Sequence, residues 1–166
     1  MDMAKTCLKE DSPFGVCLIR EGQEVGAPAV PEPVGCFAKI ASCDMEELGI
    51  LKIVAEGVER FRIVETETTK QGLVVGSVEA LAQEKGIDDA PGLPECANFL
   101  AKAITGIGVA RFAEPLRFED PSWVGFRLAE ILPLRSDVKQ KLLELTDASM
   151  RLAVLHRFLK QQKLIP

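Results

Sequence analysis

The chain has 166 residues, of which 47% are hydrophobic and 27% charged, and its formal net charge at pH 7 is -5. These values fit one ordinary globular domain or two small associated ones and exclude a disordered chain. The negative charge argues against a general attraction to nucleic acid or anionic lipid. The amino terminus lacks a signal-peptide pattern and no run of about 18 apolar residues occurs, so we expect a cytoplasmic protein without membrane segments.

The first half of the chain has the pattern of a β-rich domain. One or two helical turns are predicted over residues 2–9, a turn at Asp11-Ser12-Pro13, a short strand over 14–20, and a long excursion between strands over 21–33, which holds two glycines and three prolines. Four further strands are predicted near 35–43, 48–56, 59–67 and 72–80, with turn signals at Asp44, at Gly57 and at 70–72. Strands of this kind must curl into a small barrel or fold into a sandwich to shield their edges.

The second half has helical periodicity. We expect residues 1–81 to form a β subdomain, the polar segment 82–94 a linker, and residues 95–166 a helical subdomain. A first helix weakens at Gly106 and Gly108, a second runs from about 121 to 132 behind the N-cap Asp120, and two more open at Ser136 and Thr146. The predicted buried stripes are Ala97, Leu100, Ala101 and Ile104, then Val124, Leu128 and Ile131, then Val138, Leu142 and Leu145, and finally Ala148, Leu152, Leu155 and Leu159.

The sequence offers little for catalysis or metal binding. The five cysteines include no Cys-x-x-Cys pair, and with a single histidine no zinc set can be assembled, so we interpret the cysteines as small buried hydrophobes. No phosphate-binding Gly-x-x-x-x-Gly-Lys-Ser/Thr loop occurs. We interpret His156 as a surface histidine, and Ser136 with Lys139 as a helix cap beside a solvated charge. We therefore predict no catalytic residue, no metal and no cofactor.

Two groups of charged residues have structural interpretations. Asp147 and Arg151 have the spacing of an ion pair on a helix surface. The pair Arg60 and Arg62, joined by Lys39 and Lys52, could form a basic patch on one face of the sheet, although a solvated mixed face is the favoured interpretation.

Four pieces of sequence resemble, in order, the N-terminal domain of Lon proteases. They are Pro13-Phe14-Gly15-Val16, the segment 34–40 (VGCFAKI), the segment 56–63 (EGVERFRI), and a longer stretch from Asp120-Pro121-Ser122 through Leu132-Pro133-Leu134 and 139–144 (KQKLLE) to Asp147 and Arg151-Leu152. No single piece is specific, but together they cover most of the chain. The resemblance implies an α+β fold, in which a small PUA-like β-barrel or curled antiparallel sheet precedes a helical bundle.

By this resemblance the chain is a non-enzymatic module, since the ATPase and Ser–Lys peptidase modules of Lon have no room in it. The implied partners are unfolded or tagged protein segments, for which the chain is an adaptor to a separate ATP-dependent protease; no membrane or nucleic-acid partner is expected. The candidate peptide contacts are the large apolar side chains in and beside a proline-containing connection, although burial in the core is the favoured interpretation of these side chains: Phe112, Leu116, Phe118 and Trp123. RNA binding, which PUA-like folds also serve, and a small hydrolase are the competing hypotheses.

The chain departs from the family pattern at its start. Family members begin with a proline-rich strand, a Phe-Pro turn and an Ile-Phe-Glu-x-Arg-Tyr segment, and none of these precedes the helix that Met1 enters. We expect either a start codon placed late or a truncated member whose sheet lacks a strand. In the second case a partly unpaired edge is predicted, through which copies of the chain could associate.

Overall fold

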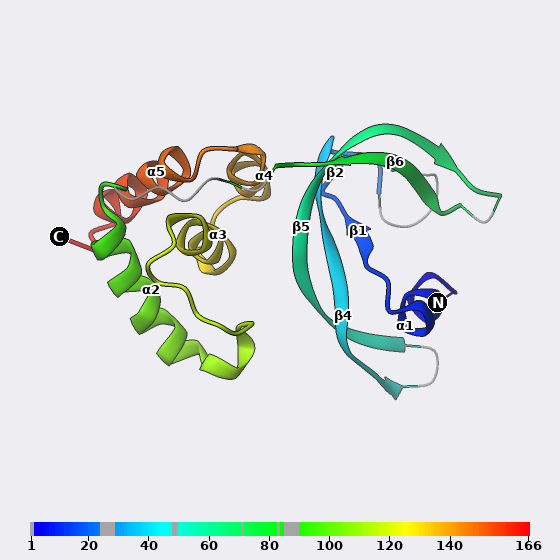
Figure 1. The fold of residues 1–166 in the computed structure, drawn as a ribbon, viewed down its shortest axis with the longest axis horizontal. Coiled ribbons are helices and arrows are strands. Elements are labelled where there is room, and N and C mark those ends of the chain that lie inside the picture. Colours follow the sequence, from blue (N-terminus) through cyan, green and yellow to red (C-terminus); the bar gives the residue numbers. More distant parts are fainter. Residues whose placement is uncertain (1, 24–28, 48–49, 71, 83, 85–89) are drawn as a thin grey trace. The chain divides into compact units, whose positions relative to one another are not determined.

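The computed structural model describes residues 2–23, 29–47, 50–70, 72–82, 84 and 90–166. The chain forms two compact units, Met1–Leu81 and Ala82–Pro166, called here the β unit and the helical unit. The described residues form antiparallel sheets in the first unit and α-helices in the second, as well as one helix at the amino terminus (Figure 1). The chain therefore has the predicted α+β fold.

The β unit contains one helix and six strands among its described residues. In chain order they are α1 (Asp2–Glu10), β1 (Phe14–Val16), β2 (Ile19–Glu21), β3 (Val30–Pro31), β4 (Val34–Glu47), β5 (Ile50–Thr68) and β6 (Val74–Ala80). Four strands form an antiparallel sheet in the order β1-β4-β5-β6, and β2 pairs with β3 in a separate sheet. β4 and β5 bend along their length, so the larger sheet curls, and α1 contacts β4 on the inner side of the curl (Figure 1).

The predicted turn at Gly57 is wrong, because β5 continues through this residue without a break. Cys36 of β4 is the partner of Arg60, and Ala38 is the partner of Gly57, so β5 advances by one more residue than β4 over this interval. The extra residue makes a β-bulge, a local kink at which glycine is common. A turn and a bulge share the same glycine signal, and the sequence pattern alone does not separate them.

The other strand boundaries also differ in part from the prediction. β4 continues past Asp44 to Glu47, so the predicted turn at Asp44 is wrong, while residues 48–49 lie outside the described part of the chain. The turn predicted at 70–72 is confirmed at its described ends, where the Gly72 N–H donates to the carbonyl of Thr69 at 2.9 Å.

The strand predicted over 14–20 is divided in two. β1 pairs with β4 and β2 pairs with β3, so the chain changes partner between Val16 and Ile19. The excursion predicted over 21–33 contains β3, and its residues 24–28 are not among those described.

The core of the β unit is small. Phe61 is its largest buried residue, only 3% exposed, and its ring lies 4.6 Å from that of Phe37. The buried hydrophobic residues among those described in this unit are Ala4, Cys7, Val34, Ala38 and Phe61. Several large apolar side chains remain exposed, including Val54, Val58 and Val64 of β5 and Val78 of β6. The sheet is therefore only partly covered.

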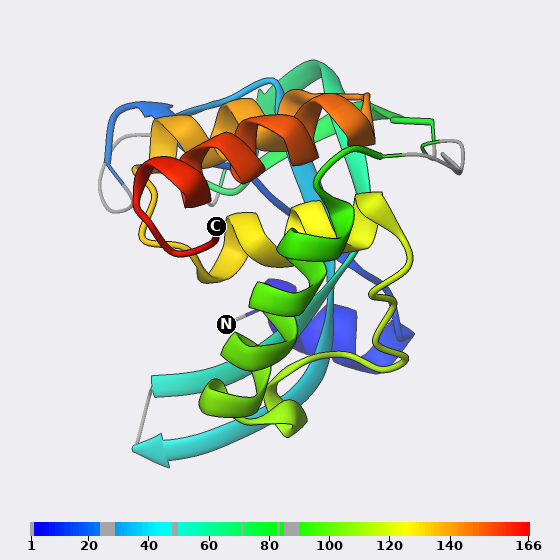
Figure 2. The same ribbon diagram turned by 90° about the vertical axis from the view of Figure 1, so that its left-hand side faces the viewer.

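The helical unit contains four α-helices and one short 3-10 helix among its described residues. They are α2 (Leu93–Ile107), η1 (Val109–Arg111), α3 (Pro121–Ile131), α4 (Ser136–Glu144) and α5 (Ala148–Gln161). α3 contacts each of the other three α-helices, and α2 crosses it steeply (Figure 2). None of the described helices combines the length and the apolar character that a membrane crossing requires.

The helix starts follow from capping residues. The carboxylate of Asp120 accepts from the N–H of Ser122 at 2.8 Å, which confirms the predicted N-cap of α3. α5 begins one residue later than a Thr146 cap would require, because the carboxylate of Asp147 accepts from the N–H of Ser149 at 2.9 Å. α4 begins at Ser136, but this serine is inside the helix and is not its cap.

The core of the helical unit is built mainly from the predicted stripes. The large apolar residues of this unit that are at most 1% exposed are Leu100, Ile104, Val124, Leu128, Leu152, Leu155 and Leu159. Val138 is the clear exception at 39% exposed, whereas the polar Gln140 of the same helix is buried at 5% exposed. The amide of Gln140 donates to the Glu144 carboxylate at 3.1 Å, which satisfies one of its polar atoms.

Candidate functional site

The predicted peptide contacts lie around the connection from η1 to α3. Phe112 ends η1 and is only 8% exposed, within the core of the helical unit. Leu116, Phe118 and Trp123 are half-buried and pack against the same core. The rings of Phe118 and Trp123 meet edge to face, with centroids 5.5 Å apart. The structure thus brings Phe118 and Trp123 into contact and packs Leu116 against the same core, whereas Phe112 fills the interior.

The connection itself presents polar groups and a proline to its surroundings. Arg111, Glu114, Pro115, Arg117 and Glu119 are all exposed, and the Glu114–Pro115 peptide bond is cis. The accessible parts of the half-buried Leu116, Phe118 and Trp123 side chains therefore lie among residues of both charges. An apolar strip with a charged rim is a common arrangement for a protein contact.

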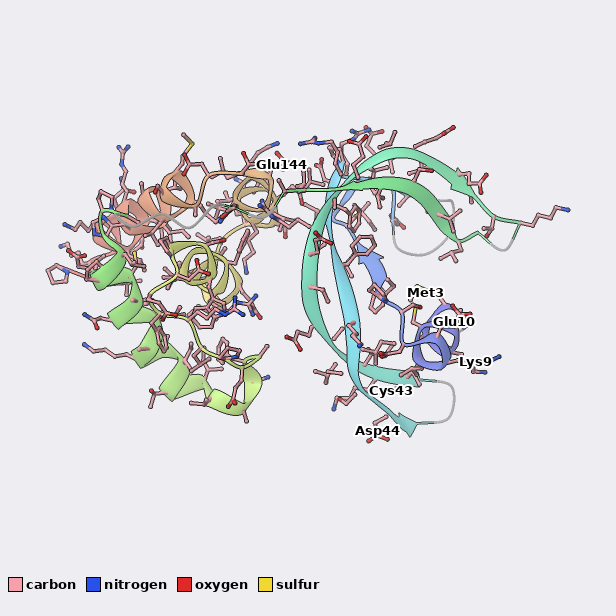
Figure 3. All side chains as sticks on the ribbon, viewed as in Figure 1. Met3, Lys9, Glu10, Cys43, Asp44 and Glu144 are labelled. Carbon is pink, nitrogen blue, oxygen red and sulfur yellow. The ribbon has the colours of Figure 1, made fainter. Side chains whose placement is uncertain are left out.

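Two of the thiols, Cys96 and Cys17, are poorly suited to nucleophilic catalysis. Burial and the neighbouring Glu95 raise the pKa of Cys96 to about 11, and burial and the neighbouring Cys36 raise the pKa of Cys17. A raised pKa keeps a thiol protonated and unreactive at neutral pH. Cys43 is exposed near one end of β4, so the interpretation of the cysteines as buried hydrophobes is wrong for this residue (Figure 3).

His156 is not the solvated surface residue that the sequence predicts. Its ring lies against Gly92, the N-cap of α2, where a Cβ atom would come within 2.7 Å of the imidazole Cγ. Its Nε2 atom is buried and has no hydrogen-bond partner among the described residues. Lys139 is likewise engaged, since its ammonium group donates to the carbonyl of Glu130 at 2.9 Å and does not activate Ser136.

No group of three or more His, Cys, Asp or Glu side chains in the described part of the chain is arranged to hold a metal ion.

Arg151 is buried, and the predicted surface ion pair with Asp147 is wrong. Its guanidinium forms a salt bridge with Glu84, in which both side chains are at most 4% exposed. Its Nε donates to the carbonyl of Leu142 at 3.0 Å and Nη2 to that of Leu145, which satisfies two carbonyls at the end of α4. The guanidinium also stacks on Phe126, with Cζ 3.7 Å from the ring centroid.

The spacing between Asp147 and Arg151 suggested a contact because i,i+4 pairs are frequent on helices, but Asp147 is occupied as a cap. Gly125 makes room for the arginine, since a Cβ there would come within 3.2 Å of the Arg151 Cδ. The buried guanidinium of Arg151 on α5 therefore links Glu84 to the end of α4.

The cations of the candidate basic patch have carboxylates as neighbours, which agrees with the favoured interpretation of a solvated surface of mixed charge. Lys39 forms a 2.9 Å ion pair with Asp11 and stands opposite Glu56 in the ladder. Lys52 stands opposite Asp44, and Arg62 stands opposite Glu79. Each of these cations therefore has a carboxylate as a neighbour.

The β5–β6 end of the sheet has an open depression that sequence reasoning did not identify. It has a volume of about 370 Å³ and is lined by Glu65, Thr66, Glu67, Val75, Gly76 and Ser77. Gly76 permits this close packing, since a Cβ there would lie 2.7 Å from the carbonyl oxygen of Glu65. β6 has β5 as its one strand neighbour among the described residues, so its other edge is open.

Comparison with known proteins identifies the class. Residues 1–161 match the family model described as the ATP-dependent protease La (LON) substrate-binding domain. Among solved structures, a Lon N-terminal domain protein from Xanthomonas campestris is 30% identical with a TM-score of 0.73, and the match covers 93% of this chain and 80% of that one. The N-terminal domain of the Mycobacterium avium complex Lon protease is 19% identical with a TM-score of 0.57, over 85% and 74% of the two chains, and shows the fold alone. No curated protein in the comparison matches the chain.

Because the family model spans nearly all of the sequence, the chain belongs to the Lon substrate-binding domain family. The predicted resemblance is therefore confirmed.

Proposed function

We propose that the chain binds unfolded or tagged segments of other proteins and presents them to a separate ATP-dependent protease, without catalysing a reaction itself. The observation that carries this proposal is the match of residues 1–161 to a substrate-binding domain. The protonated Cys96 and the engaged Lys139 are consistent with a role in binding and not in catalysis.

The first contact surface we propose consists of Leu116, Phe118 and Trp123. These side chains are half-buried, so each has an accessible part that a peptide side chain can cover. Their packing against the core holds them in fixed positions, which reduces the entropy lost on binding. Phe112 is left out because its burial makes it part of the core.

The test of the function is a fluorescence anisotropy titration at low and moderate salt. The probes are labelled, reduced and carbamidomethylated lysozyme, which cannot refold, native lysozyme and a single-stranded RNA. We expect saturable binding of the unfolded probe alone, largely retained at moderate salt because apolar contacts are weakly screened. Binding of RNA alone, declining steeply with salt, would instead identify the competing RNA-binding function.

A substitution then tests the contact surface. Phe118→Ala should weaken binding of the unfolded probe several-fold, because a half-buried aromatic ring is lost from the surface. Phe158→Ala is the matched control, since Phe158 of α5 is also partly buried against the same core but lies outside the proposed surface. Equal losses in the two variants would mean that the effect comes from core packing and would remove Phe118 from the site.

A further inference from the structure

We infer that the open edge of β6 is a second substrate contact, at which an extended segment with alternating apolar and basic side chains adds to the sheet as an antiparallel strand. The inference rests on the proposed function and specifies the chemistry of the segment that is bound. It begins from the sheet order, in which β1 and β6 are the outer strands among the described residues.

The two outer strands differ in how well they could accept another strand. β1 has three residues, and such short edges offer few pairing groups. β6 has seven residues, Val-Val-Gly-Ser-Val-Glu-Ala, with no proline or lysine to protect the edge. β6 is therefore the edge that can accept an extended peptide.

The backbone groups of β6 that point outward follow from two hydrogen bonds. The N–H of Leu81 donates to the carbonyl of Arg60 at 2.9 Å, and the N–H of Thr69 donates to the carbonyl of Leu73 at 2.8 Å. Because backbone direction alternates along an antiparallel strand, Val75, Ser77 and Glu79 face β5. The N–H and C=O groups of the intervening residues point away from β5; these residues are Val74, Gly76, Val78 and Ala80.

The side chains next to this edge define what a bound strand should carry. On one face Val78 stands beside Ile63, and Ala80 beside Phe61, so the end of this face near Ala80 is apolar. Towards Val74 the same face carries Thr66 and Thr68. Val78 is 36% exposed, which leaves apolar surface for an added strand to cover. Apolar side chains of the added strand belong on this face.

The other face carries an excess of carboxylates. Glu79 of β6 is exposed, and Glu65 and Glu67 are exposed on the adjoining part of β5, where Arg62 is the one cation in the register. Lysine or arginine side chains on this face of the added strand would be close to these carboxylates. A second copy of β6 offers no such countercharge, since the strand contains no basic residue.

The geometry also fixes which amides of the bound strand pair with β6. In an antiparallel pair, directly opposite residues place their side chains on the same face, and a residue whose backbone groups point toward the partner strand exchanges hydrogen bonds with the residue opposite it. Val78 and Ala80 point outward and lie on the apolar face, so their opposite residues are the apolar ones. The N–H groups of the apolar residues thus face β6, and those of the basic residues face solvent.

The experiment uses a labelled eight-residue peptide that alternates valine with lysine, titrated against the full chain by fluorescence anisotropy. Methylation of the valine amides should weaken binding at least about tenfold, whereas methylation of the lysine amides should change it less than about threefold.

A pair of protein variants tests the same hydrogen bonds from the side of β6. Val78→Pro removes an N–H that points outward without removing a hydrogen bond to β5, and Val78→Thr keeps this N–H. Proline should weaken the binding of the parent peptide about tenfold relative to threonine.

The outcomes distinguish a failure of the inference about the β6 edge from a failure of the proposed function. If unfolded lysozyme binds but both methylated peptides bind alike, the function stands and the edge inference is overturned. If neither unfolded lysozyme nor the peptide binds, the proposed function fails and the inference falls with it. If Val78→Pro does not fold, the two methylated peptides decide the question on the unaltered protein. A dimer that Val78→Pro dissociates, without any peptide binding, would show that the edge serves self-association and overturn the inference.

Discussion

Replacement of Arg151 by alanine should be among the most destabilising changes in the helical unit. The substitution removes the cation from a salt bridge in which Glu84 is only 4% exposed, and it leaves two carbonyls at the end of α4 without their donors. Breaking a buried pair from one side costs about 3–5 kcal/mol because a charge is left buried without a partner. We therefore expect a loss of about 4 kcal/mol in the free energy of unfolding.

The assay is thermal unfolding followed by far-ultraviolet circular dichroism. For a chain of this length each kcal/mol corresponds to about 2–4 °C, so Arg151→Ala should lower the midpoint by about 8–16 °C. Arg157→Ala is the matched control, because Arg157 lies on the same helix but is exposed, and its midpoint should be unchanged. Arg151→Lys should give an intermediate loss, since an ammonium group keeps the charge but lacks the planar fork of donors.

A double-mutant cycle separates the ion pair from the other contacts of the arginine. Glu84→Gln alone should also destabilise strongly, and its effect should be much smaller in the Arg151→Ala background, with a coupling above about 1 kcal/mol. A loss below about 1 kcal/mol for Arg151→Ala, or additive effects of the two substitutions, would refute the buried pair.

Three further predictions concern a helix cap, a pair of glycines and a pair of cysteines. Asp147→Ala removes the N-cap of α5 and should cost about 1 kcal/mol, measured by urea unfolding. Gly92→Ala should destabilise the chain because of its φ of 85° and the adjacent imidazole ring, whereas Gly106→Ala, near the end of α2 and with nothing within 4 Å, should stabilise it by about 0.5–1 kcal/mol. At pH 8 the exposed Cys43 should react with a thiol reagent well before the buried Cys96. Burial raises the pKa of Cys96 from 9.0 to about 11, so the unfolded chain loses this proton first and the free energy of unfolding should decline as the pH rises from 9 to 11. Equal reaction rates of the two thiols in the folded protein would contradict this reasoning.

Local signals in the sequence predicted the helices well. Asp120 and Pro121 fixed the start of α3, and the i,i+4 apolar pattern identified Leu152, Leu155 and Leu159 as core residues. Capping and periodicity act over a few residues, so they can be recognised without knowledge of the tertiary structure.

Features that depend on distant partners were predicted less well. Gly57 suggested a turn because the local sequence does not show which strand lies opposite. The bulge arises only from the pairing of β5 with β4, which has one residue fewer over this interval. Arg151 was assigned to the helix surface because its partner Glu84 is 67 residues away in the chain. Within the candidate site, burial was the favoured interpretation of Phe112, but the pattern of a connection did not show that Phe112 is buried more deeply than its apolar neighbours.

The small core of the β unit has a consequence for how the chain opens. The buried apolar residues of the helical unit far exceed the few around Phe61, so less burial opposes local opening of the sheet. Amide hydrogens of β6 should therefore exchange with solvent faster than those of α3 and α5. A strand added to β6 would protect these amides, so binding of a segment at this edge could be measured as slower amide hydrogen exchange in β6.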